Sequence, residues 1–226
     1  MTVGEKVCAV RERAAEAAIR AGRRPEEVRL ITVTKTIEKE RILEAIDAGA
    51  DRIGENRVQE LISKLEFLPE TVEKHIIGQL QSNKARQVVG VAALVHSVDR
   101  LSLAAELNRV AAARSLTVDA LVEVNIGGEE SKGGVAPASL FPLLEQLCSF
   151  PNLRIRGLMT VPPRCTQIEA RRYFASLREL MERAAEEFPS LPLTELSMGM
   201  SADFEEAILE GATYVRVGSA IFGARR

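Results

Sequence analysis

Lys35 stands at a position that favours chemistry, because it directly follows a short apolar segment rich in β-branched residues. That segment, residues 28–34, reads V-R-L-I-T-V-T and predicts a buried strand. A lysine at the end of such a strand is sheltered on several sides. Desolvation lowers the pKa of an amine and makes it available to attack an aldehyde. The alternative is an ordinary surface lysine at a strand terminus, and position alone does not decide between the two.

Serine and glycine residues near the C-terminus form a second candidate group. Ser201 follows the segment L-S-M-G-M, and Gly218 and Ser219 follow Y-V-R-V. Backbone N–H groups at the start of a short helix bind phosphate, and serine hydroxyl groups add donors. Phosphate sites after the last two strands are a recurrent feature of β/α barrels. The alternative is simple helix capping, which would require the same serines.

Arg216 and Asn56 are further candidates for ligand contacts. Arg216 lies among apolar residues of the predicted last strand, so its guanidinium must meet a partner or water. If it faces inward it needs an acceptor, such as a pyridine nitrogen; if it faces outward it could pair with a helix carboxylate. Asn56 lies where a helix is expected to start, and capping that helix is compatible with contacting a ligand.

His75, within an apolar run, is expected to be a core histidine with one satisfied hydrogen bond.

Predicted strands and helices alternate along the chain, which implies a parallel sheet with right-handed crossovers. Eight strands favour a closed barrel over an open doubly wound sheet, and neither G-x-G-x-x-G after a strand nor a P-loop is present. We therefore predict an α/β fold, a single (β/α)8 TIM-type barrel with an extra N-terminal helix, as one domain over residues 1–226. The predicted strands are residues 28–34, 52–54, 74–77, 94–97, 118–125, 154–160, 193–196 and 213–217, and the helices are 2–21, 38–48, 57–67, 83–90, 100–114, 138–148, 167–187 and 203–210.

Composition narrows the classes of function. The net charge of −2 offers no concentrated basic field, which argues against nucleic-acid binding. The three cysteines, Cys8, Cys148 and Cys165, form no C-x-x-C pair and no ligand cluster with His75 or His96, so no metal site is predicted. They are expected to be buried or incidental thiols in a reducing compartment. Neither a signal peptide nor a membrane span is visible, and we expect a cytoplasmic protein.

Seven segments around these residues form a recognisable set. They are V-T-K-T at 33–36, G-E-N-R-V-Q-E at 54–60, I-G-Q-L-Q-S-N-K at 77–84, H-S-V-D-R at 96–100, R-G-L-M-T at 156–160, S-M-G-M-S-A-D-F at 197–204 and V-R-V-G-S-A-I-F-G-A-R at 215–225. Together they resemble the pyridoxal phosphate homeostasis protein family of YggS/PROSC type, which is related to the barrel domain of alanine racemases. The resemblance covers almost the whole chain. Gln79 and Ser219 stand where many relatives have proline and threonine, and both are mild departures.

The resemblance implies a role for each candidate residue. Lys35 would hold pyridoxal 5′-phosphate (PLP) as a Schiff base, and Arg216 would face the pyridine nitrogen. Ser201, Gly218 and Ser219 would hold the phosphate, and Asn56 would lie near the ring. An arginine stays protonated and donates to the ring nitrogen, which makes the ring a weaker electron sink than a carboxylate partner would.

Three classes of function compete: a protein that buffers or delivers PLP, a PLP-dependent enzyme such as an amino-acid racemase, and a regulatory protein that senses the cofactor. Related racemases add a C-terminal domain that supplies a tyrosine as second base, whereas this chain ends at Arg226. A second base is then missing unless Lys132 or another loop residue substitutes. We therefore expect a monomeric PLP-binding protein with no catalytic residues and little or no turnover, which acts in PLP homeostasis with PLP-dependent apoenzymes as partners; a racemase is the alternative.

Overall fold

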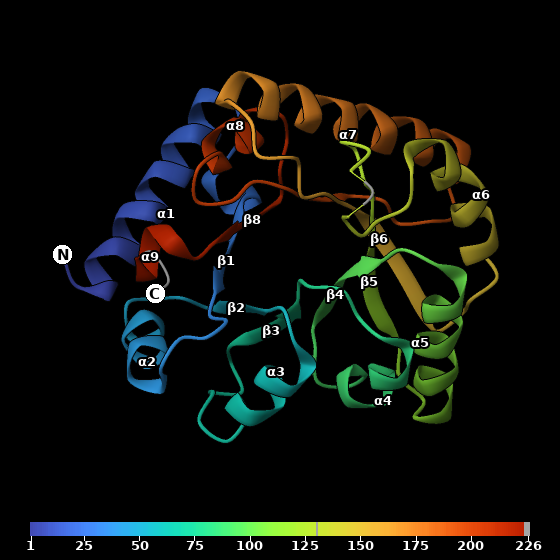
Figure 1. Ribbon diagram of the computed structural model, residues 1–226, viewed down its shortest axis with the longest axis horizontal. Helices are drawn as coiled ribbons and strands as arrows, with labels where there is room; N and C mark the ends of the chain where they lie inside the picture. The colour runs from blue at the N-terminus through green and yellow to red at the C-terminus, as the bar shows by residue number, and fades with distance from the viewer. Residues whose placement is uncertain (130, 224–226) are drawn as a thin grey trace.

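The computed structural model describes residues 1–129 and 131–223, and its parallel strands close into an eight-stranded barrel (Figure 1). Each strand pairs with the next along the chain, and β8 pairs with β1. The predicted TIM-type barrel is confirmed. Glu130 and the end of the motif at 215–225, with the chain end at Arg226, lie outside the described residues. The strands are β1 (Arg29–Val33), β2 (Arg52–Glu55), β3 (Glu73–Ile76), β4 (Leu94–Val98), β5 (Val118–Glu123), β6 (Leu153–Met159), β7 (Glu195–Ser197) and β8 (Tyr214–Val217).

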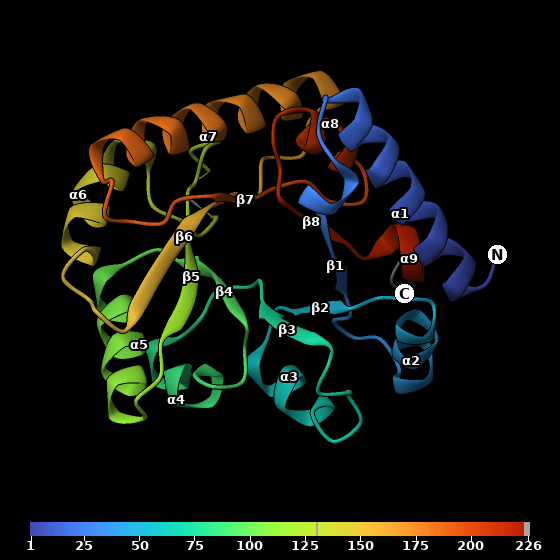
Figure 2. The same ribbon diagram turned by 180° about the vertical axis from the view of Figure 1, so that it is seen from behind.

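Helices surround the barrel, as Figures 1 and 2 show from its two ends. Figure 1 looks onto the end where the strands finish, and Figure 2 looks onto the end where they begin. The helices are α1 (Val3–Arg20), α2 (Lys39–Asp47), α3 (Val58–Lys64), α4 (Ala85–Val88), α5 (Leu101–Ala113), α6 (Pro137–Leu147), α7 (Gln167–Glu187), α8 (Phe204–Leu209) and α9 (Ser219–Phe222), with 3₁₀ turns η1 (Pro25–Glu27) and η2 (Ser82–Lys84).

The extra N-terminal helix, α1, begins with a capping box. The Thr2 hydroxyl oxygen accepts from the Glu5 N–H at 3.1 Å, and the Glu5 carboxylate accepts from the Thr2 N–H at 2.8 Å. Val3, Val7 and Val10 recur at helical spacing and are buried, and the helix packs against α2, α8 and α9. It therefore covers the part of the wall where β8 meets β1, next to the strand that precedes Lys35.

The barrel wall separates two apolar cores, because successive strand residues face opposite sides. The larger core lies between the strands and the helices and includes Ile53, Val95 and Val215. The smaller core fills the barrel interior with Ile31, Leu94, Leu121, Met159 and Tyr214. The interior is thus packed at its centre, so polar side chains that share it must have specific partners.

Two predicted elements differ from the structure in position or type, and the helix predicted at 57–67 ends earlier, at Lys64. The strand predicted at 193–196 is β7, shifted toward the C-terminus, because the N–H of Leu193 bonds the Leu191 carbonyl within a tight turn next to Pro192. The helix predicted at 83–90 is a 3₁₀ turn, η2, followed by the short α4, and Gly90 leaves the helical region with φ of 80°. In both cases a local turn competes successfully with the longer element.

Within residues 1–129 and 131–223, no helix is long and apolar enough to cross a membrane. In the same part of the chain, His, Cys, Asp and Glu side chains form no group of three or more that could hold a metal ion. Cys8, Cys148 and Cys165 are unpaired and exposed, so they are not the buried thiols that were one of the two expectations.

Candidate functional site

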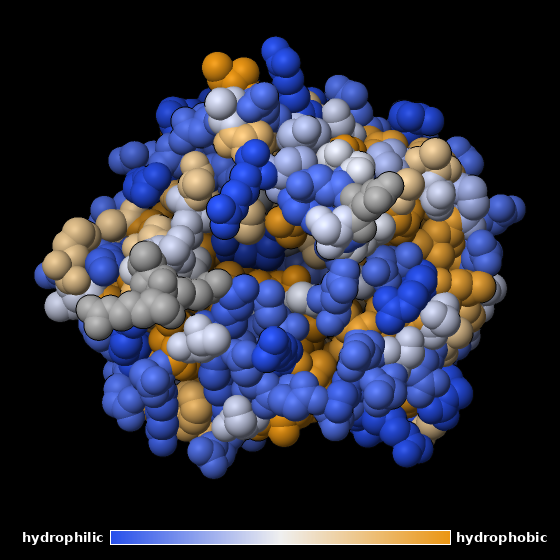
Figure 3. Space-filling model, in the orientation of Figure 1, coloured by the Kyte–Doolittle hydropathy of each residue, from blue (hydrophilic) through white to orange (hydrophobic). Residues whose placement is uncertain are grey.

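The predicted site residues converge on the mouth of the barrel where the strands end. Lys35 follows β1, Asn56 follows β2, Ser201 lies after β7, and Gly218 and Ser219 follow β8. Strands β7, β8, β1 and β2 are consecutive neighbours in the closed barrel, so these residues share one sector of the mouth. The same face is mostly hydrophilic and is hollowed near its centre (Figure 3). This is the end at which β/α barrels bind ligands.

The residue before Lys35 is anchored by a buried ion pair. The Thr34 hydroxyl donates to Glu55 Oε1 at 2.5 Å, and the Lys64 ammonium donates both to Glu55 Oε1 at 2.6 Å and to the Thr34 carbonyl at 2.8 Å. Thr34 and Glu55 are fully buried and Lys64 is nearly so. Burial is the largest influence on the Glu55 carboxyl and raises its pKa, while Lys64 and Thr34 act in the opposite direction. The pair fixes the end of β1 to β2 and α3.

The residue after Lys35 has an unusual backbone conformation. Thr36 has φ of 59°, in the left-handed region that a β-branched side chain rarely adopts. Such a conformation costs about 1–3 kcal/mol and persists where the surroundings impose it. Here the Thr36 N–H donates to Glu60 Oε2 at 3.0 Å. Lys35 therefore lies in a turn that is held on both sides by residues of the segment G-E-N-R-V-Q-E and by Lys64.

Backbone donors after β8 gather around Ser201. The N–H groups of Gly218 and Ala220 both point to Ser201 Oγ, at 3.3 and 3.2 Å. These distances are long for hydrogen bonds to a hydroxyl oxygen, so a more strongly accepting anion could replace it. Ser219, the first residue of α9, is exposed. The structure therefore brings Ser201, Gly218 and Ser219 together as a group of donors next to the turn that carries Lys35.

Arg216 faces the barrel interior and is almost fully buried. Its Nη1 donates to Ser197 Oγ at 2.5 Å and its Nη2 donates to the Thr160 carbonyl at 2.8 Å. Burial lowers the pKa of Arg216 to about 10, opposed by the nearby carboxyl groups of Glu123 and Asp203. The outward alternative, pairing with a helix carboxylate, is thus wrong. A guanidinium has five N–H donors, so donors remain for a ligand in the mouth.

Glu123, the last residue of β5, is a buried carboxyl that the sequence analysis missed. Its Oε2 has no hydrogen-bond partner among the residues that the structure describes. Burial, with Asp99 acting in the same direction and Arg216 opposing, raises the pKa of Glu123 to about 7. A buried carboxyl oxygen without a donor is costly. A ligand at the C-terminal mouth that brings a hydrogen-bond donor would therefore satisfy the Glu123 carboxyl group.

Two expectations about polar residues need correction. Asn56 does not cap α3, because the capping position is Arg57 and no side chain forms a cap bond there. Asn56 stays half-buried at the mouth, with its backbone packed against Gly78. His75 is a core histidine as expected, yet it has two side-chain partners rather than one: His96 at 3.0 Å and Glu73 at 3.3 Å.

Comparisons with known proteins agree with this geometry. Residues 8–226 match the family model of the alanine racemase N-terminal domain. A pyridoxal phosphate homeostasis protein of Aquifex aeolicus is 44% identical over 100% of both chains, and one of Escherichia coli is 40% identical over 99% of this chain and 97% of its own. The chain belongs to the pyridoxal phosphate homeostasis protein family. The family expected from the motifs is confirmed.

A solved structure extends the comparison of this family member to three dimensions. PipY of Synechococcus elongatus, solved with PLP bound, is 37% identical, covers 98% of this chain and 100% of its own, and has a TM-score of 0.85. Such a score over nearly the whole of both chains means that the two proteins share the same overall fold.

Proposed function

We propose that this protein binds pyridoxal 5′-phosphate at the C-terminal mouth of the barrel and acts in PLP homeostasis. The observation that carries the proposal is the convergence of a strand-end lysine, a buried arginine and a group of phosphate donors in a chain 37% identical to a PLP-bound structure. The donor set fits the cofactor, since an amine, a cationic donor and backbone N–H groups match an aldehyde, a pyridine nitrogen and a phosphate. When bound, PLP would supply an electron-withdrawing ring attached to a reactive aldehyde.

Each residue has a distinct task in this proposal. Lys35 would supply the amine that condenses with the cofactor aldehyde to a Schiff base, with the aldehyde oxygen leaving as water. Arg216, oriented by Ser197 and Thr160, donates to the pyridine nitrogen. Ser201, Gly218 and Ser219 hold the phosphate, and Asn56 lies beside the ring. Residues 1–226 would act together as one cofactor-binding domain.

The physiological role is to buffer PLP or to deliver it to PLP-dependent apoenzymes. Three unpaired, exposed cysteines are typical of a reducing compartment, which supports a cytoplasmic location. The nearly balanced charge of −2 supports small-molecule rather than nucleic-acid binding.

We propose that the protein is a monomer. Light scattering at micromolar concentration should give a mass of 24.7 kDa; twice that mass would overturn this part of the proposal.

A spectroscopic titration tests cofactor binding. Adding PLP to the wild-type protein should give the visible absorption band of a cofactor bound covalently to an amine, with saturation at one PLP per chain. Lys35→Met should remove that band while the thermal unfolding temperature stays near that of the wild type. Lys84→Met is the matched control, because Lys84 follows β3 at the same mouth in the turn η2. A colourless wild-type protein after incubation with PLP would refute the proposal.

The racemase alternative requires a second base near the cofactor. The chain has two tyrosines: Tyr173 lies in α7, and Tyr214 lies at the start of β8 and lines a cavity at the opposite mouth. Lys132, the other candidate base, pairs with Glu129 at 2.5 Å and donates to the Pro162 carbonyl at 2.9 Å. The two tyrosines lie away from the C-terminal mouth, and the Lys132 ammonium is engaged by Glu129 and Pro162. We therefore propose that the protein has little or no turnover.

The proposed absence of racemase turnover can be tested by isotope exchange. A positioned general acid or base contributes about 10²–10⁴-fold to a rate, so its absence makes racemisation slow. Incubation of the PLP-loaded protein with L-alanine in deuterated water should give Cα deuterium at the level of free PLP, with no D-alanine. Turnover of about one per second, which is within the ordinary range for enzymes, would favour the racemase.

A further inference from the structure

A chain of hydrogen-bonded side chains crosses the barrel interior from Arg216 to the opposite mouth. Arg216 Nη1 lies 2.5 Å from Ser197 Oγ, which lies 2.9 Å from His96 Nδ1. His96 Nε2 lies 3.0 Å from His75 Nδ1, and His75 Nε2 lies 3.3 Å from Glu73 Oε2. Arg216, Ser197, His96 and His75 are buried, whereas the Glu73 side chain is 44% exposed. The chain therefore connects the candidate site to the solvent-accessible end of Glu73.

The direction of every hydrogen bond in this chain follows from its two ends. A guanidinium only donates, so Ser197 Oγ accepts from Arg216 and its own proton is available for His96 Nδ1. His96 then carries its proton on Nε2 and donates to His75 Nδ1. His75 likewise carries its proton on Nε2 and donates to the Glu73 carboxylate. All four bonds are satisfied with both histidines neutral.

The opposite tautomers fail at two places. If His96 carried its proton on Nδ1, Ser197 would accept twice, and the described residues offer its buried hydroxyl proton no other acceptor. His75 would then donate from Nδ1 and present an unprotonated Nε2 to the Glu73 carboxylate, so that two acceptors would face each other. Buried polar groups without partners are costly, so the arrangement with both protons on Nε2 is strongly favoured.

The charged groups around the chain support neutral histidines. Burial lowers the pKa of His75, with Arg52 and Arg29 acting in the same direction and Glu73 opposing. Burial also lowers the pKa of His96 well below its ordinary value, and His75 and Arg216 add to this effect.

An aromatic ring and two carboxyl groups lie next to this hydrogen-bond chain. The Tyr214 ring packs against both histidines, with ring centroids 5.6 and 5.7 Å away. On the Arg216 side, the facing carboxyl groups are Glu123 and Asp203.

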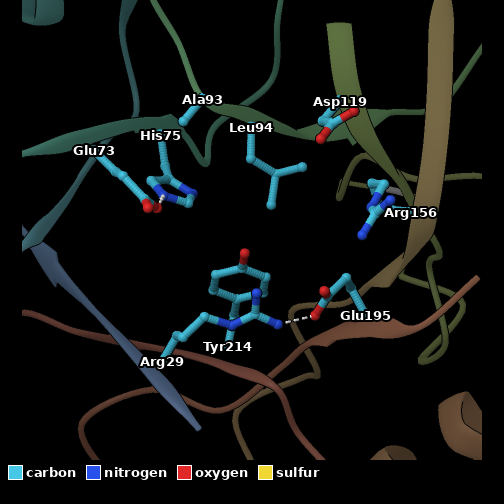
Figure 4. A pocket seen from close by; sticks show the side chains of 9 residues that line it. All are labelled: Arg29, Glu73, His75, Ala93, Leu94, Asp119, Arg156, Glu195 and Tyr214. Atoms are coloured by element: carbon cyan, nitrogen blue, oxygen red, sulfur yellow. Dashed lines mark hydrogen bonds and ion pairs between the residues drawn. The ribbon is translucent and has the colours of Figure 1, made fainter. Parts of the chain in front are cut away.

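The far end of the chain lies in a cavity of about 260 Å³ at the mouth where the strands begin. Figure 4 shows Glu73 beside His75 on one side of this cavity and the Arg29–Glu195 ion pair on the other. Tyr214 lies between them, and Arg156 faces the cavity from β6. Glu73 also pairs with Arg52 at 3.1 Å, which keeps its carboxylate charged and in place as the final acceptor.

We propose that Ser197, His96, His75 and Glu73 are positioning residues for Arg216, acting as a one-directional hydrogen-bond chain with both histidines protonated on Nε2. The chain holds the guanidinium in one orientation, so that its remaining donors face the C-terminal mouth. The part of this inference that concerns PLP rests on the proposed function, whereas the direction of the chain does not.

The first test reads the histidine tautomers directly. The protein has only two histidines, His75 and His96. Long-range ¹H–¹⁵N spectra of the wild-type protein therefore contain two imidazole ring systems and no overlap from other histidines. Both should show a protonated Nε2 and an unprotonated Nδ1 between about pH 6 and 8, with no titration in the range where an ordinary histidine changes charge. A proton on Nδ1 of either ring, or a doubly protonated ring at pH 7, would overturn the inference. This outcome is independent of whether PLP binds.

The second test compares two buried serines. Ser197→Ala removes the acceptor of Arg216, should shift the His96 Nδ1 resonance, and should weaken PLP binding about tenfold or more, as expected for losing one hydrogen bond to a charged group. Ser97→Ala is the matched control, because Ser97 is also buried but is not part of the hydrogen-bond chain. Its hydroxyl group donates to the Gly78 carbonyl at 2.6 Å. Ser197→Thr keeps the hydroxyl group and should restore affinity and the resonance.

Equal PLP affinity and equal histidine resonances in Ser197→Ala and Ser97→Ala would contradict the positioning role. If the wild-type protein bound no PLP at all, the proposed function would fail. The histidine resonances of Ser197→Ala and Ser97→Ala would still decide whether the hydrogen-bond chain from Arg216 to Glu73 exists.

Discussion

Pyridoxal should bind this protein at least about 100-fold more weakly than pyridoxal 5′-phosphate, since losing two charge-assisted hydrogen bonds at about 1.5–3 kcal/mol each corresponds to that factor or more. In the proposed site the phosphate donors are the N–H groups of Gly218 and Ala220, which point to Ser201 Oγ, and the serine hydroxyl groups beside them. Competition between the two aldehydes, followed by absorbance, measures the ratio of affinities. Equal affinity would exclude the phosphate site after β8.

A variant cycle separates the phosphate contribution from the rest of the site. Ser201→Ala should weaken PLP binding but leave pyridoxal binding nearly unchanged, because in the proposed site the hydroxyl group contacts only the phosphate. Ser149→Ala is the control, since Ser149 is exposed after α6 and bonds only the Gln146 carbonyl, at 2.7 Å. Equal weakening of both aldehydes by Ser201→Ala would mean that Ser201 acts through the fold rather than through the phosphate.

Lys64→Met should lower the free energy of unfolding by about 3–5 kcal/mol, the typical cost of removing one partner of a buried ion pair. The substitution leaves the fully buried Glu55 carboxylate without its cation and the Thr34 carbonyl without its donor. Urea unfolding of the protein without cofactor measures the loss. The double variant Glu55→Gln, Lys64→Met should recover part of it, because no uncompensated charge then remains.

The free energy of unfolding that Lys64→Met loses relative to the wild type should also depend on pH. Burial already raises the pKa of Glu55, and removing Lys64 takes away the main opposing influence. In the variant the folded state therefore binds a proton more tightly than the unfolded state, so its stability is greatest at acid pH and falls as the pH rises through the raised pKa. The difference between wild type and variant should shrink at acid pH. Arg109→Met is the control, because it breaks the more exposed ion pair between Arg109 and Glu106. If Lys64→Met lost no more free energy of unfolding than Arg109→Met, the account would be contradicted.

The sequence was sufficient to predict that the candidate residues lie at one mouth of the barrel, but not which contacts hold them. Strand ends can be read from short β-branched segments, and a parallel barrel brings the ends of all strands to one mouth. Lys35, Asn56, Ser201, Gly218 and Ser219 were placed there for that reason. The resemblance then supplied their roles, which stay predictions.

The supporting contacts could not be predicted because they depend on side-chain direction and register across the barrel. Ser197 and His96 are 101 residues apart and meet only because β4 and β7 face each other across the interior. Lys64 lies at the end of α3, where a lysine ordinarily faces solvent. The unusual φ of Thr36 has no signal in its residue type, since a β-branched residue argues against it.

Mapping the site of covalent attachment tests the central claim most directly. The PLP-loaded protein is reduced with borohydride, digested with trypsin and analysed by mass spectrometry. The account predicts a pyridoxyl phosphate group on Lys35, which would block cleavage there and give a peptide over residues 30–39 that contains the label. Label on another lysine, or none after reduction, would contradict it.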